Sequence, residues 1–215
     1  MSLITVIDYG VGNLFSVKNA FIKLGFEVLV TDNPEKVAKA DRLVLPGVGA
    51  FKVGMQNLTA IHMDKAIFEF LKSGNPMIGI CLGMQMLVDD SSEYGNTPGL
   101  GIIPGKVLAI PVTTASGTKH KIPHIGWCPL SPPQDAKANA WQTSPLEPVT
   151  PGTSFYFVHS FAVNVKDRKD LLAVTDYNGR EIAAAIRKDN VMGTQFHPEK
   201  SGPVGLEILA AFGRS

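Results

Sequence analysis

The sequence contains few cysteines, almost no net charge and no long apolar run. Its two cysteines, Cys81 and Cys128, exclude a disulfide framework and are typical of a reducing compartment. With 20 basic and 19 acidic residues the net charge is +1, which favours neither nucleic acid nor an anionic membrane as a partner. No apolar run approaches the roughly 20 residues of a transmembrane helix, and the start of the chain lacks signal-peptide features. We therefore expect a cytoplasmic protein.

Metal and cofactor sites are not indicated either. The two cysteines lie far apart, and no histidine or cysteine pair has the spacing of metal ligands. The chain has 215 residues, of which 45% are hydrophobic, enough for a full core. We expect one domain spanning residues 1–215, with no cofactor and no metal.

Apolar segments alternate with helical patterns in the first hundred residues. This alternation predicts parallel strands with right-handed crossovers. Beyond Leu100 the segments resemble strands joined by short turns, which indicates a mixed or antiparallel portion. We expect an α/β three-layer sandwich around a mixed, mostly parallel sheet. The expected strands are 3–7, 26–30, 42–45, 76–80, 106–110, 155–163, 171–177, 182–187 and 191–196. The expected helices are 12–24, 66–71, 82–88 and 204–212, with a surface loop and short helix in 131–152.

Positions 79–85, GICLGMQ, join a predicted buried strand to a predicted helix. Their Gly-x-Cys-x-Gly spacing is that of a nucleophile elbow with sulfur in place of oxygen. A Cβ atom at Gly79 or Gly83 would clash in so tight a turn. The turn would raise the Cys81 thiol to the carboxyl edge of the sheet, near a helix N-terminus that favours the thiolate. A small buried hydrophobic role for Cys81 is the alternative.

A His-Pro-Glu segment follows the last predicted strand. His197 and Glu199 are two apart, so on extended chain both point to the same side. Glu199 could then hold one imidazole nitrogen while the other faces a thiol, as in a nucleophile, base and orienter triad. The alternative is a solvated surface turn. His62 and His120 have no acid in a comparable position.

The segments 79–85 and 195–201 (QFHPEKS) resemble the signature pair of the class I, triad-type glutamine amidotransferases, which have a flavodoxin-like fold. Four further segments resemble, within that family, the glutaminase subunits of imidazole glycerol phosphate synthases. They are IDYGVGN at 7–13, PGVG at 46–49, PHIGW at 123–127 and FYFVHS at 155–160. The likeness covers essentially the whole chain. Cys128 and Phe161 depart from it, since asparagine and tyrosine are usual there, but neither position belongs to the triad.

The resemblance implies a mechanism and a partner. The Cys81 thiolate would attack the side-chain carboxamide of glutamine, and His197, oriented by Glu199, would protonate the departing ammonia. Water would then release glutamate from the thioester. The ammonia would pass, inside a heterodimer, to a (β/α)₈-barrel synthase subunit that forms imidazole glycerol phosphate and aminoimidazole carboxamide ribotide.

The substrate pocket follows from the same chemistry. An oxyanion needs two fixed backbone N–H donors. One would come from Leu82, and the resemblance assigns the other to Val48, whose neighbours Gly47 and Gly49 let the peptide rotate. Gln85 could reach the amino-acid end of glutamine, or be a solvated helix residue. The segment 159–161 could present backbone groups to that end through Ser160 and Phe161, or be a strand edge, and we expect a structural role for His159.

Four residues are candidates for the partner interface, namely Asn13, Trp127, Tyr156 and Lys200. Tryptophan and tyrosine are common anchors of buried contacts, although core packing explains them equally well. The glycine-rich segment 8–13 also invites a dinucleotide interpretation. Phe15 stands in place of the third glycine, which argues against it.

Three other functions remain open. A glutaminase could serve another ammonia-using synthase, but the segments 123–127 and 155–160 argue against this. A cysteine peptidase would need an open groove. A non-catalytic module with a vestigial triad is the last alternative.

Overall fold

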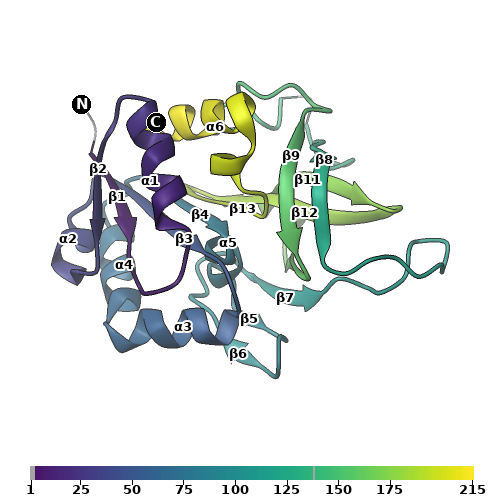
Figure 1. Cartoon of the computed structure of the whole chain (residues 1–215), viewed down its shortest axis with the longest axis horizontal. Coiled ribbons are helices and arrows are strands. Elements are labelled where there is room, and N and C mark those ends of the chain that lie inside the picture. The colour runs from purple at the N-terminus through teal and green to yellow at the C-terminus, as the bar shows by residue number, and fades with distance from the viewer. Residues whose placement is uncertain (1–2, 138) are drawn as a thin grey trace.

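A seven-stranded sheet forms the centre of the protein (Figure 1). The computed structural model describes residues 3–137 and 139–215. The strand order is β11-β12-β13-β4-β3-β1-β2, in which β13, β4, β3, β1 and β2 are parallel and β11 and β12 are antiparallel. This confirms the mixed, mostly parallel sheet. The strands are β1 (Leu3–Ile7), β2 (Glu27–Thr31), β3 (Arg42–Gly47), β4 (Met77–Cys81), β11 (Leu171–Tyr177), β12 (Arg180–Lys188) and β13 (Val191–Thr194).

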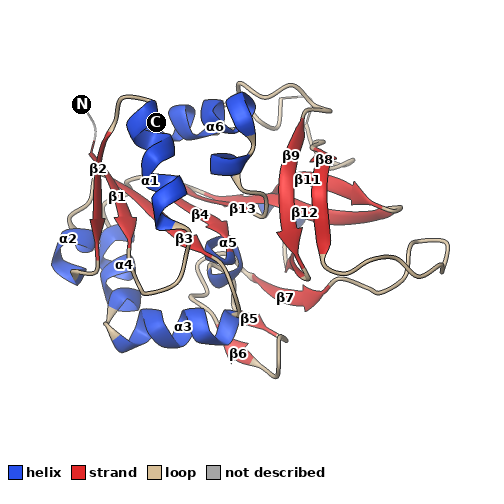
Figure 2. Ribbon diagram, viewed as in Figure 1, coloured by secondary structure: helices blue, strands red, loops and turns tan. Residues whose placement is uncertain are grey.

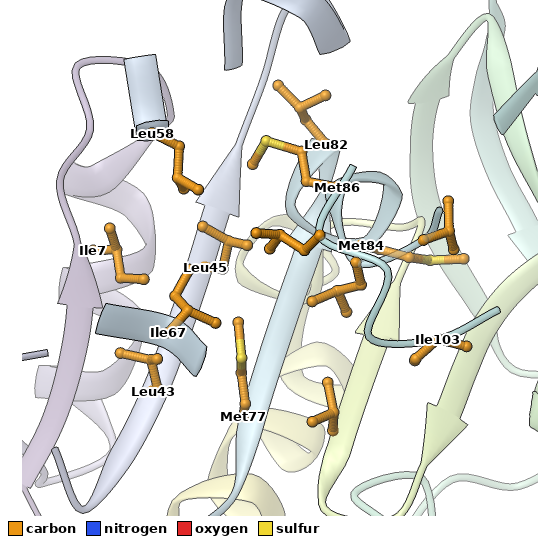
Figure 3. Close-up of a cluster of buried hydrophobic side chains, with 14 of the residues drawn as sticks. Ile7, Leu43, Leu45, Leu58, Ile67, Met77, Leu82, Met84, Met86 and Ile103 are labelled. Carbon is orange, nitrogen blue, oxygen red and sulfur yellow. The ribbon is translucent and has the colours of Figure 1, made fainter. Parts of the chain in front are cut away.

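Helices cover both faces of this sheet (Figure 2). On one face Ile4 and Val6 of β1 pack with Phe21 and Phe212 from α1 (Leu14–Lys23) and α6 (Gly202–Arg214). The other face packs against α2 (Pro34–Ala38), α3 (Phe51–Ala60), α4 (Met63–Leu71) and α5 (Leu82–Met86). There Leu45 lies among side chains of the sheet and the helices (Figure 3). Successive side chains of a strand thus pack on opposite faces of the sheet, because side chains alternate along a β-strand.

Two smaller sheets flank the antiparallel edge. One has the order β10-β7-β5-β6, from β10 (Phe161–Val165), β7 (Gly105–Ala109), β5 (Asp90–Ser91) and β6 (Thr97–Pro98). The other pairs β8 (His124–Pro129) with β9 (Ser154–His159), so that Trp127 lies opposite Tyr156. Two short 3₁₀ helices complete the fold, η1 (Arg168–Asp170) and η2 (Pro198–Lys200).

The structure corrects several predicted elements. The single strand expected at 155–163 is two strands, because β9 pairs with β8 while β10 pairs with β7 in a different sheet. The described residues of 131–152 form turns and contain no helix. The helix expected from residue 12 begins at Leu14, because the Asn13 side chain caps it by accepting from the Ser16 N–H. The helices α2 and α3 and the strands β5, β6 and β8 were not predicted.

Within the described part of the chain, no helix combines the length and the apolar character needed to cross a bilayer.

Candidate active site

Cys81 occupies a strained turn between β4 and α5. Its backbone has φ 56° and ψ −108°, a conformation that residues with a side chain rarely adopt. The flanking glycines make this approach possible. A Cβ atom on Gly79 would lie 2.7 Å from the Gly83 carbonyl oxygen, and one on Gly83 would overlap the Leu45 carbonyl group. The steric prediction for this elbow is therefore confirmed.

His197 and Glu199 form a buried pair beside this turn. His197 Nδ1–H donates to Glu199 Oε1 at 2.8 Å, and the two side chains are 2% and 1% exposed. The alternative of a solvated turn is thus excluded. The expected extended geometry is wrong, because Glu199 lies in η2 and the 3₁₀ turn brings the two side chains together. The His197 backbone N–H donates to the Tyr156 carbonyl at 3.0 Å and anchors the segment.

The sheet topology places His197 next to the thiol. His197 follows β13 and Cys81 ends β4. These strands are parallel neighbours, so their carboxyl ends lie side by side at the same edge of the sheet. Burial opposes the charged imidazole, but interactions with Cys81 and Glu199 outweigh it and raise the pKa of His197 to about 9. The remaining ring nitrogen, Nε2, is buried and lies outside ordinary hydrogen-bond geometry from every described residue. At neutral pH an imidazolium therefore lies within electrostatic range of the Cys81 sulfur.

A cavity of about 240 Å³ opens beside these groups. Its small volume suits a metabolite rather than a chain segment. Gly47, which was also expected at the substrate, is not among the described lining residues, and a Cβ atom there would meet the Tyr9 hydroxyl at 2.5 Å. Glu199 does not line the cavity either and contacts it through His197. The lining residues that were expected from the sequence are Val48, Gly49, Cys81, Leu82, Gln85, Ser160, Phe161 and His197.

Glu93 is a lining residue that the sequence did not indicate. It follows the two-residue strand β5, and its carboxylate accepts from the Phe51 N–H at 2.7 Å, which fixes its position. A carboxylate in this cavity suits an ammonium group. Val158 and His159 complete the lining.

The Gln85 amide nitrogen is already occupied by protein groups. It donates to the Phe161 carbonyl and to Gln195 Oε1, both at 3.0 Å. The amide oxygen of Gln85, in contrast, accepts no hydrogen bond from any described residue. The alternative of a solvated helix residue is excluded, because Gln85 is 6% exposed.

The interface candidates extend from the cavity toward solvent. Trp127 is 56% exposed, so core packing does not explain it. Its ring lies 6.1 Å from that of Tyr156, which in turn lies 6.5 Å from the His197 ring. Lys200 is exposed on η2, and α1, which Asn13 caps, packs against η2.

A larger cavity, of about 680 Å³, lies at the opposite edge of the sheet, where β4 and β13 begin. It is lined by residues such as Met77, Arg187 and Asn190, and its described lining residues include no cysteine or histidine. Size therefore does not identify the site here. The convergence of a strained thiol and a charged imidazole does.

The fold and this site define an α/β enzyme with a thiol elbow at the carboxyl edge of its sheet. The family model "Glutamine amidotransferase class-I" matches residues 5–214, and the chain belongs to that family of enzymes. It is 46% identical over 212 residues to "Imidazole glycerol phosphate synthase subunit HisH 1" of Legionella pneumophila (strain Lens), covering 99% of both chains. The HisH subunit of Syntrophotalea carbinolica is also 46% identical, over 98% of this chain and 99% of that one.

A solved structure shows the same fold at lower identity. The "Structure of PurLQS from Thermotoga maritima" superposes with a TM-score of 0.68 at 20% identity, over 99% of this chain and 98% of that chain. This likeness supports the three-layer architecture and no more.

Proposed function

We propose that this protein is the glutaminase subunit of an imidazole glycerol phosphate synthase, in histidine biosynthesis. It hydrolyses glutamine to glutamate and ammonia. The relatives that carry this name match over nearly their full length. The observation that carries the proposal is that the strained Cys81 and His197, which is paired with the buried Glu199, line one small cavity.

Cys81 is the nucleophile in this mechanism. Its thiolate attacks the glutamine side-chain carboxamide, and the carbonyl oxygen becomes an oxyanion. Leu82 and Val48 line the cavity, and their backbone N–H groups stabilise that charge, at about 2.7–4 kcal/mol for one such donor. The protonated His197 gives its proton to the departing ammonia. The neutral imidazole then activates the water that hydrolyses the thioester.

The amino-acid end of glutamine is held on the far side of the cavity. The Glu93 carboxylate receives the α-ammonium group, and the Gln85 amide oxygen accepts a further hydrogen bond from it. Backbone groups of Ser160 and Phe161 bind the α-carboxylate. Support for these roles is that all four residues line the cavity that contains Cys81.

The partner is a (β/α)₈-barrel synthase subunit in a heterodimer, and it receives the ammonia. Trp127, Tyr156, Lys200 and Asn13 form the docking face. Support comes from the word "subunit" in the relatives' names and from an exposed tryptophan near the cavity. The proposal also takes residues 1–215 as one glutamine amidotransferase domain and places the protein in the cytoplasm, in keeping with two unpaired cysteines.

Reconstitution tests the proposal. The chain is co-purified with a barrel synthase subunit, and synthesis of imidazole glycerol phosphate is measured with glutamine or with ammonium salt as nitrogen source. Cys81→Ser should abolish the glutamine-dependent reaction and leave the ammonia-dependent one. Cys128→Ser is the matched control and should retain both. Equal loss of both reactions in Cys81→Ser, or glutamine-dependent synthesis that survives it, would contradict the mechanism.

A further inference from the structure

Two buried glutamine amides connect the Cys81 sulfur to a backbone carbonyl. Gln195 is fully buried, and its Nε2 atom lies 3.8 Å from Cys81 Sγ. Its Oε1 atom accepts from Gln85 Nε2 at 3.0 Å, and the same Nε2 donates to the Phe161 carbonyl at 3.0 Å. Gln195 does not line the cavity itself.

The direction of these hydrogen bonds is fixed by the carbonyl. The Phe161 oxygen can only accept, so the Gln85 amide must turn its nitrogen toward it. The second N–H of Gln85 then points to Gln195, so the Gln195 side-chain oxygen must accept that hydrogen bond. The Gln195 nitrogen is left facing the Cys81 sulfur, and no exchange of nitrogen and oxygen in either amide preserves the other bonds.

A second arm reaches the same carbonyl from the other side. His159 Nδ1 lies 2.8 Å from the Phe161 oxygen, and His159 Nε2 lies 2.9 Å from His124 Nδ1. His124 Nε2 lies 3.1 Å from Cys128 Sγ. Burial lowers the pKa of His124 to about 4 and that of His159 to about 3, so both rings are neutral at pH 7. Each ring therefore donates once and accepts once, and His159 must donate to Phe161.

We propose that Gln195 is a further catalytic residue, whose amide N–H is held on the Cys81 sulfur and favours its thiolate, with Gln85 as the positioning residue. This rests on the proposed role of Cys81 as nucleophile. An N–H donated to a charged acceptor is stronger than one donated to a neutral acceptor, so it favours the thiolate over the thiol. The sulfur loses its negative charge when it attacks, so this hydrogen bond does not make each thiolate more reactive. It raises the rate by increasing the fraction of Cys81 that is thiolate near neutral pH.

Other titratable groups also face Cys81 and must be held constant. The imidazolium of His197, with Glu199 behind it, approaches from η2, and Tyr9 approaches from the end of β1. Glu93 lies across the cavity after β5, and the neutral His159 lies on β9. Substitutions at Gln195 change none of these five side chains. A shift in the neutral variant Gln195→Met therefore reports on the loss of the amide donor, while Gln195→Glu adds the effect of a nearby negative charge.

The test measures alkylation of Cys81 by iodoacetamide against pH, followed as the modified peptide by mass spectrometry. Gln195→Glu keeps the shape and replaces the donor by an acceptor. Gln195→Met removes the donor at similar volume. Gln56→Glu, on the exposed surface of α3, is the matched control for the charge change. Cys128 alkylation in the same samples is an internal control, because its hydrogen-bond direction is set through His124 from the other arm.

The midpoint pH for Cys81 should rise by more than one unit in Gln195→Glu, and by a smaller amount in Gln195→Met. The Gln56→Glu and Cys128 profiles should not move. Glutamine turnover by the Met variant should show lower kcat at neutral pH, recovery toward wild type at high pH, and little change in KM. An unshifted midpoint in Gln195→Met, in protein with an unchanged Cys128 profile, overturns the proposal even if Gln195→Glu shifts.

The alkylation measurement also separates this inference from the proposed function. It needs no glutamine and no partner. Shifted midpoints in a protein that fails to hydrolyse glutamine would sink the proposed function and leave the Gln195 contact established.

Discussion

Adding one methyl group at Gly83 should disable the elbow. Gly83 lies in the first turn of α5, where it faces the backbone of β3. A Cβ atom there would lie 2.9 Å from the Leu45 carbonyl carbon, and closer to its oxygen. Non-bonded carbon atoms prefer about 3.5–4.0 Å, and the oxygen is closer still, so Gly83→Ala must separate α5 from β3 by at least roughly 1 Å. The neighbour is backbone and cannot rotate away.

Two effects of opposite sign decide the magnitude. Alanine in a helix gains about 1 kcal/mol over glycine, while overpacking against a rigid wall costs about 1–3 kcal/mol and sometimes more. Because the overlap is with rigid backbone, the cost lies at the upper end, about 3 kcal/mol, and we expect the free energy of unfolding to fall by about 2 kcal/mol. The effect on catalysis is larger, because a displacement of about 1 Å at a reacting group costs roughly a hundredfold in rate. The kcat for glutamine should therefore fall by about a hundredfold or more.

The assay compares Gly83→Ala with Gly74→Ala. Gly74 has φ +74° and no atom near its missing Cβ, so alanine there meets backbone strain of about 1 kcal/mol without a clash. Urea unfolding and glutamine turnover are measured for both variants. Gly74→Ala should be mildly destabilised with unchanged kcat. A Gly83→Ala enzyme with kcat within a fewfold of wild type would refute the argument that close approach of α5 to β3 sets the geometry of the thiol.

Three further predictions follow from the site. Glutamine turnover should decline as pH rises through about 9, where His197 deprotonates, and Glu199→Gln should move this alkaline limb to lower pH. The charge on His197 also stabilises the folded protein, fully below about pH 6.5 and less as pH rises through about 9. This contribution to the free energy of unfolding should be smaller in Glu199→Gln when unfolding is measured against pH. Glu93→Gln should raise KM for glutamine about tenfold with a smaller effect on kcat, in steady-state kinetics, since a charge-assisted bond to the ammonium is weakened. Trp127→Ala should weaken binding of a barrel subunit by about 2 kcal/mol, roughly thirtyfold in Kd by calorimetry. An unchanged alkaline limb would contradict the role of His197, an unchanged KM that of Glu93, and an unchanged Kd that of Trp127.

The elbow was predictable because its evidence is local. Two glycines flank the cysteine, a buried strand precedes it and a helix follows, and each feature is visible within ten residues. The His-Pro-Glu segment was equally visible. What the sequence did not contain is that β13 pairs with β4, which alone brings His197 to Cys81. The resemblance to a family implied that His197 acts with Cys81, but not the strand pairing that brings them together, and periodicity could not supply it either.

Other features could not be predicted for identifiable reasons. Glu93 follows a strand of two residues, too short to leave a periodic pattern. The break at Ser160 is invisible because both of its flanks are β-like, and only their pairing with different sheets separates them. The helix α3 is a different case. Phe51, Met55 and Leu58 follow helical spacing, so the pattern was present and was missed.

Two of the three sheets that contribute to the cavity are linked by one side chain, and this link has a physical consequence. Cys81 and the segment carrying His197 lie at the carboxyl edge of the seven-stranded sheet. Phe161 begins β10 of the four-stranded sheet, and Glu93 follows β5 of that same sheet. The amide of Gln85 spans the two, through the Phe161 carbonyl on one side and Gln195 on the other. A displacement of β10 would therefore stretch the hydrogen bonds that orient Gln195, so the geometry at the sulfur depends on the position of β10 as well as on the elbow.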